Sequence, residues 1–120
     1  MARINVEDLV RAAEEKYDFW EVDFGDDGVV RFGNPMRLGR EAREGVFGAF
    51  GDLGKLHEGK VDEVEGDVVD VCRRLFKHSC IQGDAELLFK LVGEDTALWG
   101  EVLGAYFEAV KLGEALRSAE

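Results

Sequence analysis

The chain has 120 residues, of which 46% are hydrophobic and 34% charged, and its formal net charge is −11. Its length is typical of one domain of ~100–150 residues, and its composition is that of a globular protein. No apolar run approaches the ~20 residues of a membrane span, and the first residues lack the apolar core of a signal peptide. The acidic balance counts against nucleic-acid binding, which relies on Lys and Arg. We therefore expect a cytoplasmic protein with no membrane and no nucleic-acid partner.

The N-terminal part predicts a helix followed by a β-hairpin. Asn5 can cap a helix over residues 5–17, and the acids that follow it suit the positive end of a helix dipole. At Trp20 the apolar period changes from helical to alternating, which predicts a hairpin over residues 19–32 with a turn at residues 25–28. Asn34 ends the hairpin, because a residue before proline favours extended geometry.

From residue 40 to residue 117 the apolar pattern is helical. We expect a helix over residues 40–50, a polar linker over 51–60, a longer helix over 61–79, a short one from 84 and a last one from 95. Glycines at 45, 48, 51 and 54 each cost a helix up to ~1 kcal/mol, which favours fraying beyond residue 50. Alternatively, these glycines let another helix approach closely. The prediction is a single domain, residues 1–120, of the mainly α class: a small helical bundle with one N-terminal β-hairpin.

The sequence contains no complete motif for catalysis or metal binding. Asp23-Phe24-Gly25 is a triplet that kinases use to hold magnesium, but the kinase glycine-rich loop, paired lysine and HRD loop are missing. A calcium loop counted from Asp23 would place Asn34 where a glutamate is required. The cysteines and histidines lack zinc spacing, and no Ser or Cys is paired with a His as a nucleophile. We therefore expect no enzyme activity, no cofactor and no metal.

Residues 29–43 form a basic island in an acidic chain. They carry four arginines and one acid, whereas the segments on both sides have a net negative charge. The arginines either pair with the chain's own carboxylates or form a surface that meets the acids of another copy, which would give a homo-oligomer. The partner-binding residues predicted here are Arg31, Asn34, Pro35, Arg37, Arg40 and Arg43.

The last helix has apolar side chains around more of its circumference than one core-facing stripe requires. It is either the central helix of the bundle, wrapped on all sides, or a helix whose aromatic residues also reach a partner. In the second case, Gly100 and Gly104 would let a neighbouring helix come close. The partner-binding residues predicted here are Trp99, Tyr106 and Phe107.

The order of these features resembles the tail assembly chaperones of long-tailed (siphovirus-type) phages of actinobacteria. The resemblance rests on RF.NP.RL at residues 31–38 and LW..VL.AYFEA..LGEA at residues 98–115. It implies an assembly factor of the host cytoplasm that binds the tape measure protein, keeps it soluble and helps recruit the major tail (tube) protein. It also implies a longer frameshifted form of the chain as a partner, and departure before the virion is finished.

An alternative function is an acidic protein-binding module of another kind, such as a DNA-mimic inhibitor. A small acidic fold suits that role, because it can present the charge of a nucleic acid to a basic partner. Such a mimic needs an ordered acidic stripe, and the basic island interrupts the acidic sequence.

Overall fold

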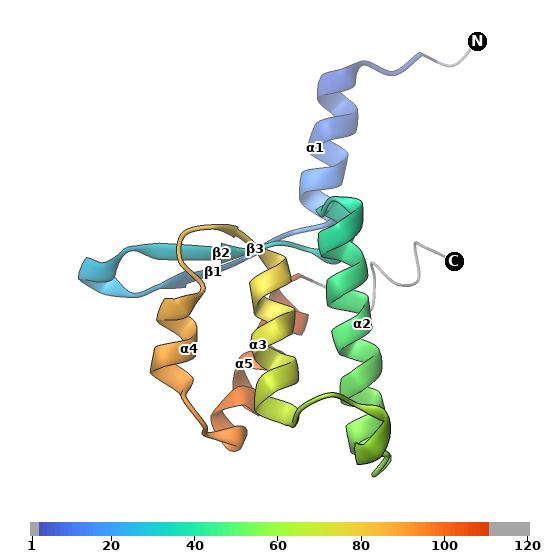
Figure 1. The fold of residues 1–120 in the computed structure, drawn as a ribbon. Helices are drawn as coiled ribbons and strands as arrows, with labels where there is room; N and C mark the ends of the chain where they lie inside the picture. Colours follow the sequence, from blue (N-terminus) through green and yellow to red (C-terminus); the bar gives the residue numbers. More distant parts are fainter. Residues whose placement is uncertain (1–2, 111–120) are drawn as a thin grey trace.

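The computed structural model describes residues 3–110. Figure 1 shows the helices α2 to α5 lying on one side of a small sheet, while α1 projects from the other side. Helices make up most of this part of the chain, so the predicted mainly α class is confirmed. The elements are α1 (Val6–Lys16), β1 (Trp20–Asp23), β2 (Val29–Phe32), α2 (Arg40–His57), α3 (Val68–Ser79), β3 (Cys80–Gln82), α4 (Glu86–Val92) and α5 (Thr96–Ala109).

The predicted hairpin is present, but a third strand joins it. β1 and β2 pair antiparallel, with Trp20 opposite Phe32, and β2 pairs in turn with β3, where Phe32 lies opposite Cys80. The sequence analysis missed β3 because three residues are too short to show alternation. This strand depends on a pairing partner far away in the sequence. The sheet order is therefore β1-β2-β3.

Aromatic side chains join the sheet to the helices. The ring of Phe76 on α3 lies 5.2 Å from that of Phe32, 5.9 Å from that of Trp99 and 5.3 Å from that of Tyr106, between ring centroids. All four side chains are fully buried. Since large aromatic side chains contribute most to a small core, this cluster fixes β2, α3 and α5 relative to one another.

The predicted starts of the first and last helices are confirmed. The side-chain oxygen of Asn5 accepts the amide of Asp8 at 2.9 Å, and that of Asp95 accepts the amide of Leu98 at 3.1 Å. These caps satisfy backbone donors that have no partner within the helix. Of the predicted helical segment, residues 111–117 lie outside the described residues. The single-domain assignment stays a prediction.

The prediction for α2 was wrong beyond residue 50, because the helix continues to His57 without a linker. Leu53 and Leu56 pack against the core in this part of the helix, and their burial offsets the low helix propensity of the glycines. At Gly45 the alternative interpretation holds. A Cβ there would lie 2.5 Å from the ring of His78, so the glycine allows α2 and α3 to approach.

The predicted start of α3 was also wrong, since α3 begins at Val68 rather than at residue 61. Residues 61–63 instead form a separate 3-10 turn. Asp67 and Asp70 make a capping box in which each side chain accepts the other's backbone amide at 3.0 Å. Gly66, which precedes this cap, has a φ of +91°, a backbone conformation that glycine adopts readily.

Candidate functional site

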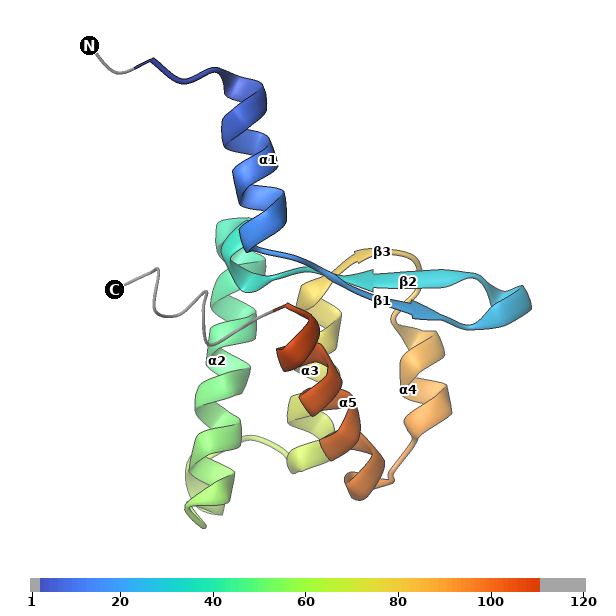
Figure 2. The same cartoon turned by 180° about the vertical axis from the view of Figure 1, so that it is seen from behind.

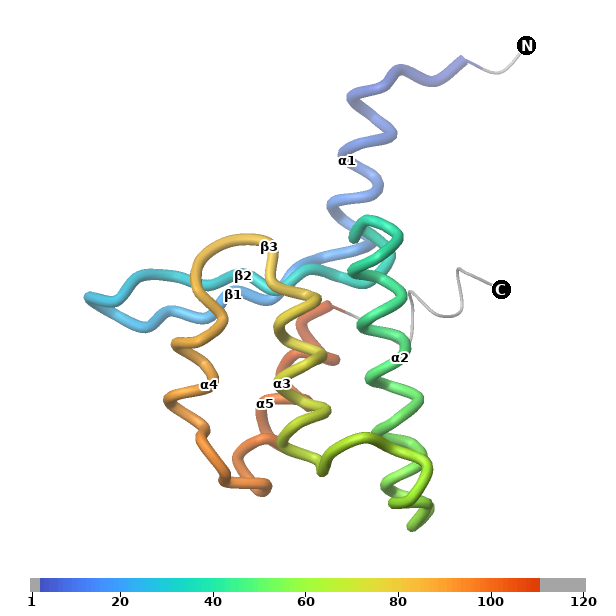
Figure 3. Tube along the Cα trace, in the orientation of Figure 1, coloured from blue at the N-terminus to red at the C-terminus, as the bar shows by residue number. Residues whose placement is uncertain are grey.

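The two sequence motifs that carry the family resemblance meet where the hairpin ends. The amide of Gly33 donates to the carbonyl oxygen of Ser79 at 2.7 Å. The hydroxyl of Tyr106 donates to the carbonyl oxygen of Gly33 at 2.7 Å, and the side-chain amide of Asn34 donates to the carbonyl oxygen of Val110 at 2.7 Å. These bonds join the end of the hairpin to the ends of α3 and α5. Figure 3 traces the chain through this junction into α2.

Asn34 and Pro35 have a structural role in the turn between β2 and α2. The side-chain oxygen of Asn34 accepts the amide of Met36 at 2.9 Å, which caps the 3-10 turn Pro35–Arg37. Asn34 is only 1% exposed and Pro35 is buried. The side chain of Asn34 therefore hydrogen-bonds both to Val110 at the end of α5 and to Met36 in the turn, which orients the segment that leads into α2.

The structure divides the arginines of the basic island into two sets. Arg31 is used internally: its Nε donates to Glu21 at 2.8 Å across the hairpin, and its guanidinium lies 5.0 Å from the ring centroid of Phe19. Arg37 and Arg40 are exposed and Arg43 is half-buried. Among residues 3–110, none of these last three lies within 4.0 Å of a carboxylate oxygen. Within the described residues, these three arginines therefore differ from Arg31 in having no ionic partner.

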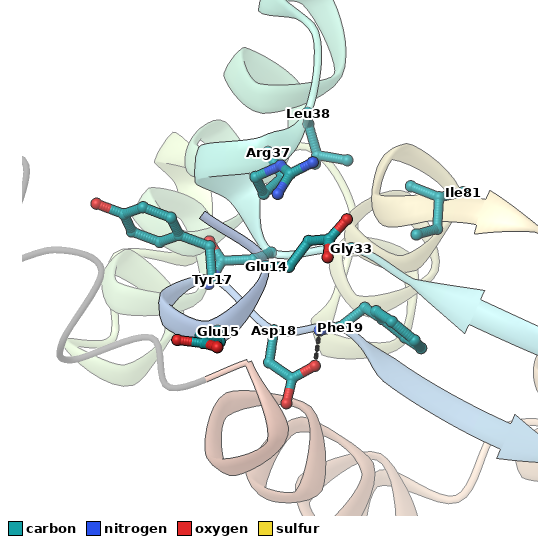
Figure 4. A pocket seen from close by; sticks show the side chains of 10 residues that line it. Glu14, Glu15, Tyr17, Asp18, Phe19, Gly33, Arg37, Leu38 and Ile81 are labelled. Atoms are coloured by element: carbon teal, nitrogen blue, oxygen red, sulfur yellow. Dashed lines mark hydrogen bonds between the residues drawn. The ribbon is translucent and has the colours of Figure 1, made fainter. Parts of the chain in front are cut away.

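An open pocket of about 490 Å³ lies at the base of α1 (Figure 4). Its walls come from the end of α1, from the residues between α1 and β1, from the segment between β2 and α2, and from β3. Arg37 lines it from one side and Glu14 from another, while Phe19 and Ile81 supply apolar surface. In the described part of the chain, no group of three His, Cys, Asp or Glu side chains could hold a metal ion.

Two of the three aromatic residues predicted on the last helix lie in the core. Trp99 and Tyr106 are fully buried, and Trp99 Nε1 donates to the carbonyl oxygen of Gly93 at 3.0 Å. Burial also raises the pKa of Tyr106. These two side chains therefore belong to the core, but the interpretation of a helix wrapped on all sides was wrong, because only one face of α5 is covered and Leu98 is 37% exposed. Gly100 and Gly104 face open space, because a Cβ at either position would meet nothing within 4 Å.

Phe107 belongs to a half-buried aromatic row, which we define as Phe47, Phe50 and Phe107. The ring of Phe107 on α5 lies 5.4 Å from that of Phe50 on α2, and Phe50 lies 5.9 Å from Phe47. The backbones of α2 and α5 can be followed in Figure 2. The sequence analysis did not select Phe47 and Phe50. Their spacing of three residues, which places them on one helix face, is the signal that could have found them.

Residues 1–115 match the model of a family described as mycobacteriophage tail assembly protein. The chain belongs to that family. The expected role in phage tail assembly is therefore confirmed for this tail assembly protein. No curated protein and no solved structure matches it. Among the residues that the structure describes, no helix is long and apolar enough to cross a membrane.

The tail assembly protein has a second basic cluster, which the sequence analysis missed. An open groove of about 720 Å³ between α3 and α4 is lined by Arg73, Arg74, Lys77 and Lys90 together with Glu86, Phe89 and Gly93. Arg73 pairs with Glu94 at 3.4 Å, between Nη2 and Oε1. Arg74 pairs with Asp52 at 2.6 Å, between Nη1 and Oδ2. Arg73, Arg74 and Lys77 already lie close together in the sequence with no acid between them, and the packing of α4 beside α3 adds Lys90. Together with the exposed arginines, they interrupt the acidic surface that a DNA mimic requires.

Proposed function

We propose that the chain is a tail assembly chaperone that binds the tape measure protein and keeps it soluble. Membership of the tail assembly family supports this role, and the aromatic row is the observation that carries it. A tape measure protein is long, largely helical and apolar before the tail tube encloses it. Half-buried phenylalanines on two neighbouring helices offer an apolar helix a surface of matching character. The net charge of −11 would keep such a complex dispersed.

The proposal extends to the later steps of assembly. The chaperone acts without enzymatic chemistry in the host cytoplasm, together with a longer frameshifted form of itself. It helps recruit the major tail (tube) protein around the tape measure and leaves before the virion is finished. Mass spectrometry of infected cells and of purified virions tests this course. Peptides of the chain and of an extended form should occur in the cells and be missing from the virions.

Co-expression with the tape measure protein of the same phage tests the central step. The wild-type chain should raise the soluble fraction of the tape measure protein and co-purify with it. Phe47→Gln and Phe107→Gln should lose this effect while keeping the wild-type circular dichroism spectrum. Leu91→Gln is the matched control, because Leu91 is a 65% exposed apolar residue on α4, away from the aromatic row.

The possible outcomes separate the parts of the proposal. Equal insolubility of the tape measure protein with and without the wild-type chain would overturn the chaperone function. Full capture by folded Phe47→Gln and Phe107→Gln variants would overturn the assignment of the aromatic row. Loss of capture by Leu91→Gln as well would show that any polar substitution of an exposed apolar residue abolishes capture, and would overturn the assignment of binding to the aromatic row.

A further inference from the structure

The pocket at the base of α1 exposes apolar side chains (Figure 4). Phe19 and Ile81 line it and are 42% and 53% exposed. Phe19 precedes β1 and Ile81 lies in β3, so the opening is built from residues that are far apart in the sequence. A hollow that combines exposed apolar surface with charged residues is typical of a site where another protein segment binds.

Acids outnumber bases among the residues that line this pocket. The charged lining residues are Glu14, Glu15, Asp18 and Arg37. Among residues 3–110, none of the four lies within 4.0 Å of a group of opposite charge. Of the bases nearby, Arg11 and Arg31 already pair with carboxylates at 3.4 and 2.8 Å, and the ammonium of Lys16 lies 5.6 Å from the ring centroid of Tyr17. A segment that binds here should therefore bring bases to the end of α1 and an acid to Arg37.

The described chain ends beside this pocket. Two of the lining residues, Gly33 and Asn34, bond to the end of α5. The hydroxyl of Tyr106 donates to the carbonyl oxygen of Gly33, and the side-chain amide of Asn34 donates to the carbonyl oxygen of Val110, both at 2.7 Å. Residue 111 is joined to that same carbonyl group, so the chain continues from the lining of the pocket. Seven residues span ~10 Å as a helix and ~23 Å when extended, which is sufficient to cover a pocket of about 490 Å³.

The sequence of residues 111–117 contains side chains that match this lining. Leu112 and Leu116 are four residues apart, a spacing that places both on one side of a helix. They are apolar, as Phe19 and Ile81 of the pocket are. The charged residues of this segment are two bases, Lys111 and Arg117, with one acid, Glu114, between them. The segment therefore offers two bases to the acids of α1 and one acid to the arginine.

We propose that residues 111–117 dock into this pocket of their own chain. Leu112 and Leu116 pack against Phe19 and Ile81, and the two bases lie beside the carboxylates at the end of α1. The chain's own segment is the occupant because a short tether holds it near the site at an effective concentration of mM order, which a second copy reaches only in mM solutions. This docking ties the base of α1 to the end of α5. It uses no part of the aromatic row and does not rest on the proposed function.

Hydrogen exchange of the purified full chain, followed by mass spectrometry, tests the proposal. In wild type, the backbone amides of residues 111–117 should exchange ~10-fold or more slowly than those of an unstructured chain. Leu112→Asp with Leu116→Asp should remove this protection and should also speed exchange in residues 17–19, which line the pocket. Leu91→Asp with Val61→Asp is the matched control. It makes the same change at two apolar residues elsewhere that are 65% and 60% exposed, and should leave both regions as in wild type.

A charge exchange tests the orientation of the docked segment. Glu14→Lys with Glu15→Lys should lower the protection of residues 111–117 roughly 10-fold, because attractions to the two bases become repulsions. Adding Lys111→Glu with Arg117→Glu should restore the protection. Failure of the exchange to restore it would overturn the contact between these bases and α1.

Asp26→Lys with Asp27→Lys is the matched control for the charge exchange. These exposed neighbouring acids lie in the hairpin turn and are not part of the pocket, so their replacement makes the same change in net charge elsewhere. This control should protect residues 111–117 as wild type does. An equal loss of protection in both lysine variants would show that net charge alone acts, and would overturn the assignment to the pocket.

The remaining outcomes identify other occupants. Residues 111–117 that exchange like an unstructured chain in wild type would overturn the proposal. Protection that rises with protein concentration would assign the pocket to a second copy, and protection that requires an added tape measure protein would assign it to that partner. Either result would overturn docking within the chain. Each readout is the exchange of the chain's own amides, so its failure leaves the co-expression result for the proposed function untouched.

Discussion

Asn34→Ala tests whether the junction of hairpin and last helix stabilises the fold. The substitution removes two hydrogen bonds, one to the carbonyl oxygen of Val110 at 2.7 Å and one from the amide of Met36 at 2.9 Å. Each bond contributes ~1 kcal/mol to stability. Leaving the carbonyl group of the buried Val110 without a partner costs a further ~1–3 kcal/mol. We expect the free energy of unfolding to fall by about 3–5 kcal/mol. Against a typical total of ~5–15 kcal/mol, that loss is large.

Urea unfolding followed by tryptophan fluorescence measures this change, because the fully buried Trp99 reports on the core. Asn5→Ala is the matched control: it removes the same type of side chain from another cap, where the oxygen of Asn5 accepts the amide of Asp8 at 2.9 Å. Since α1 buries no residue, its fraying should lower the free energy of global unfolding by less than ~1 kcal/mol. If Asn34→Ala costs no more than Asn5→Ala, the reasoning about the junction is refuted.

Two further predictions concern close packing and titration. Gly45→Ala should destabilise the chain by ~1–3 kcal/mol, because its Cβ would lie 2.5 Å from His78, whereas Gly48→Ala in open space should stabilise it by ~0.5–1 kcal/mol. Equal shifts in urea unfolding would contradict this contrast. Burial raises the pKa of Cys72 from 9.0 to about 11, so the unfolded thiol ionises first and stability should fall between pH 9 and 11 by up to ~3 kcal/mol. Cys72→Ala should flatten this fall, although Tyr106, whose pKa burial also raises, lowers the stability of both proteins above pH 10. Identical pH profiles for the two proteins would contradict the assignment to Cys72.

Some features of the fold that depend on local chemistry could be predicted from the sequence, whereas the equally local capping box of Asp67 and Asp70 at the start of α3 was missed. Asn5 and Asp95 start their helices as expected, because a capping bond is made within three residues. Features that depend on distant contacts could not be predicted. The second half of α2 is stabilised by the packing of Leu53 and Leu56, which outweighs the glycine penalty. β3 exists because β2 offers it a free edge.

The candidate site shows the same division. The sequence grouped the arginines by position, but only the pairing of β1 with β2 decides that Arg31 lies opposite Glu21 and is used internally. Likewise, the helical period could not say which side of the last helix would be covered. Trp99 and Tyr106 are buried and Phe107 is half-buried, because α3 and β2 meet only one face of α5.

The junction also explains why two motifs far apart in the sequence occur together. RF.NP.RL supplies Asn34 and the carbonyl group of Gly33, and the last helix supplies Tyr106 and the carbonyl group of Val110 that bond to them. Each motif leaves a buried polar group without a partner if the other is changed, so they form one structural requirement. The residues by which the sequence resembles its family therefore define the scaffold. It follows that specificity for a partner should reside in surfaces outside the junction, namely the exposed arginines and the aromatic row.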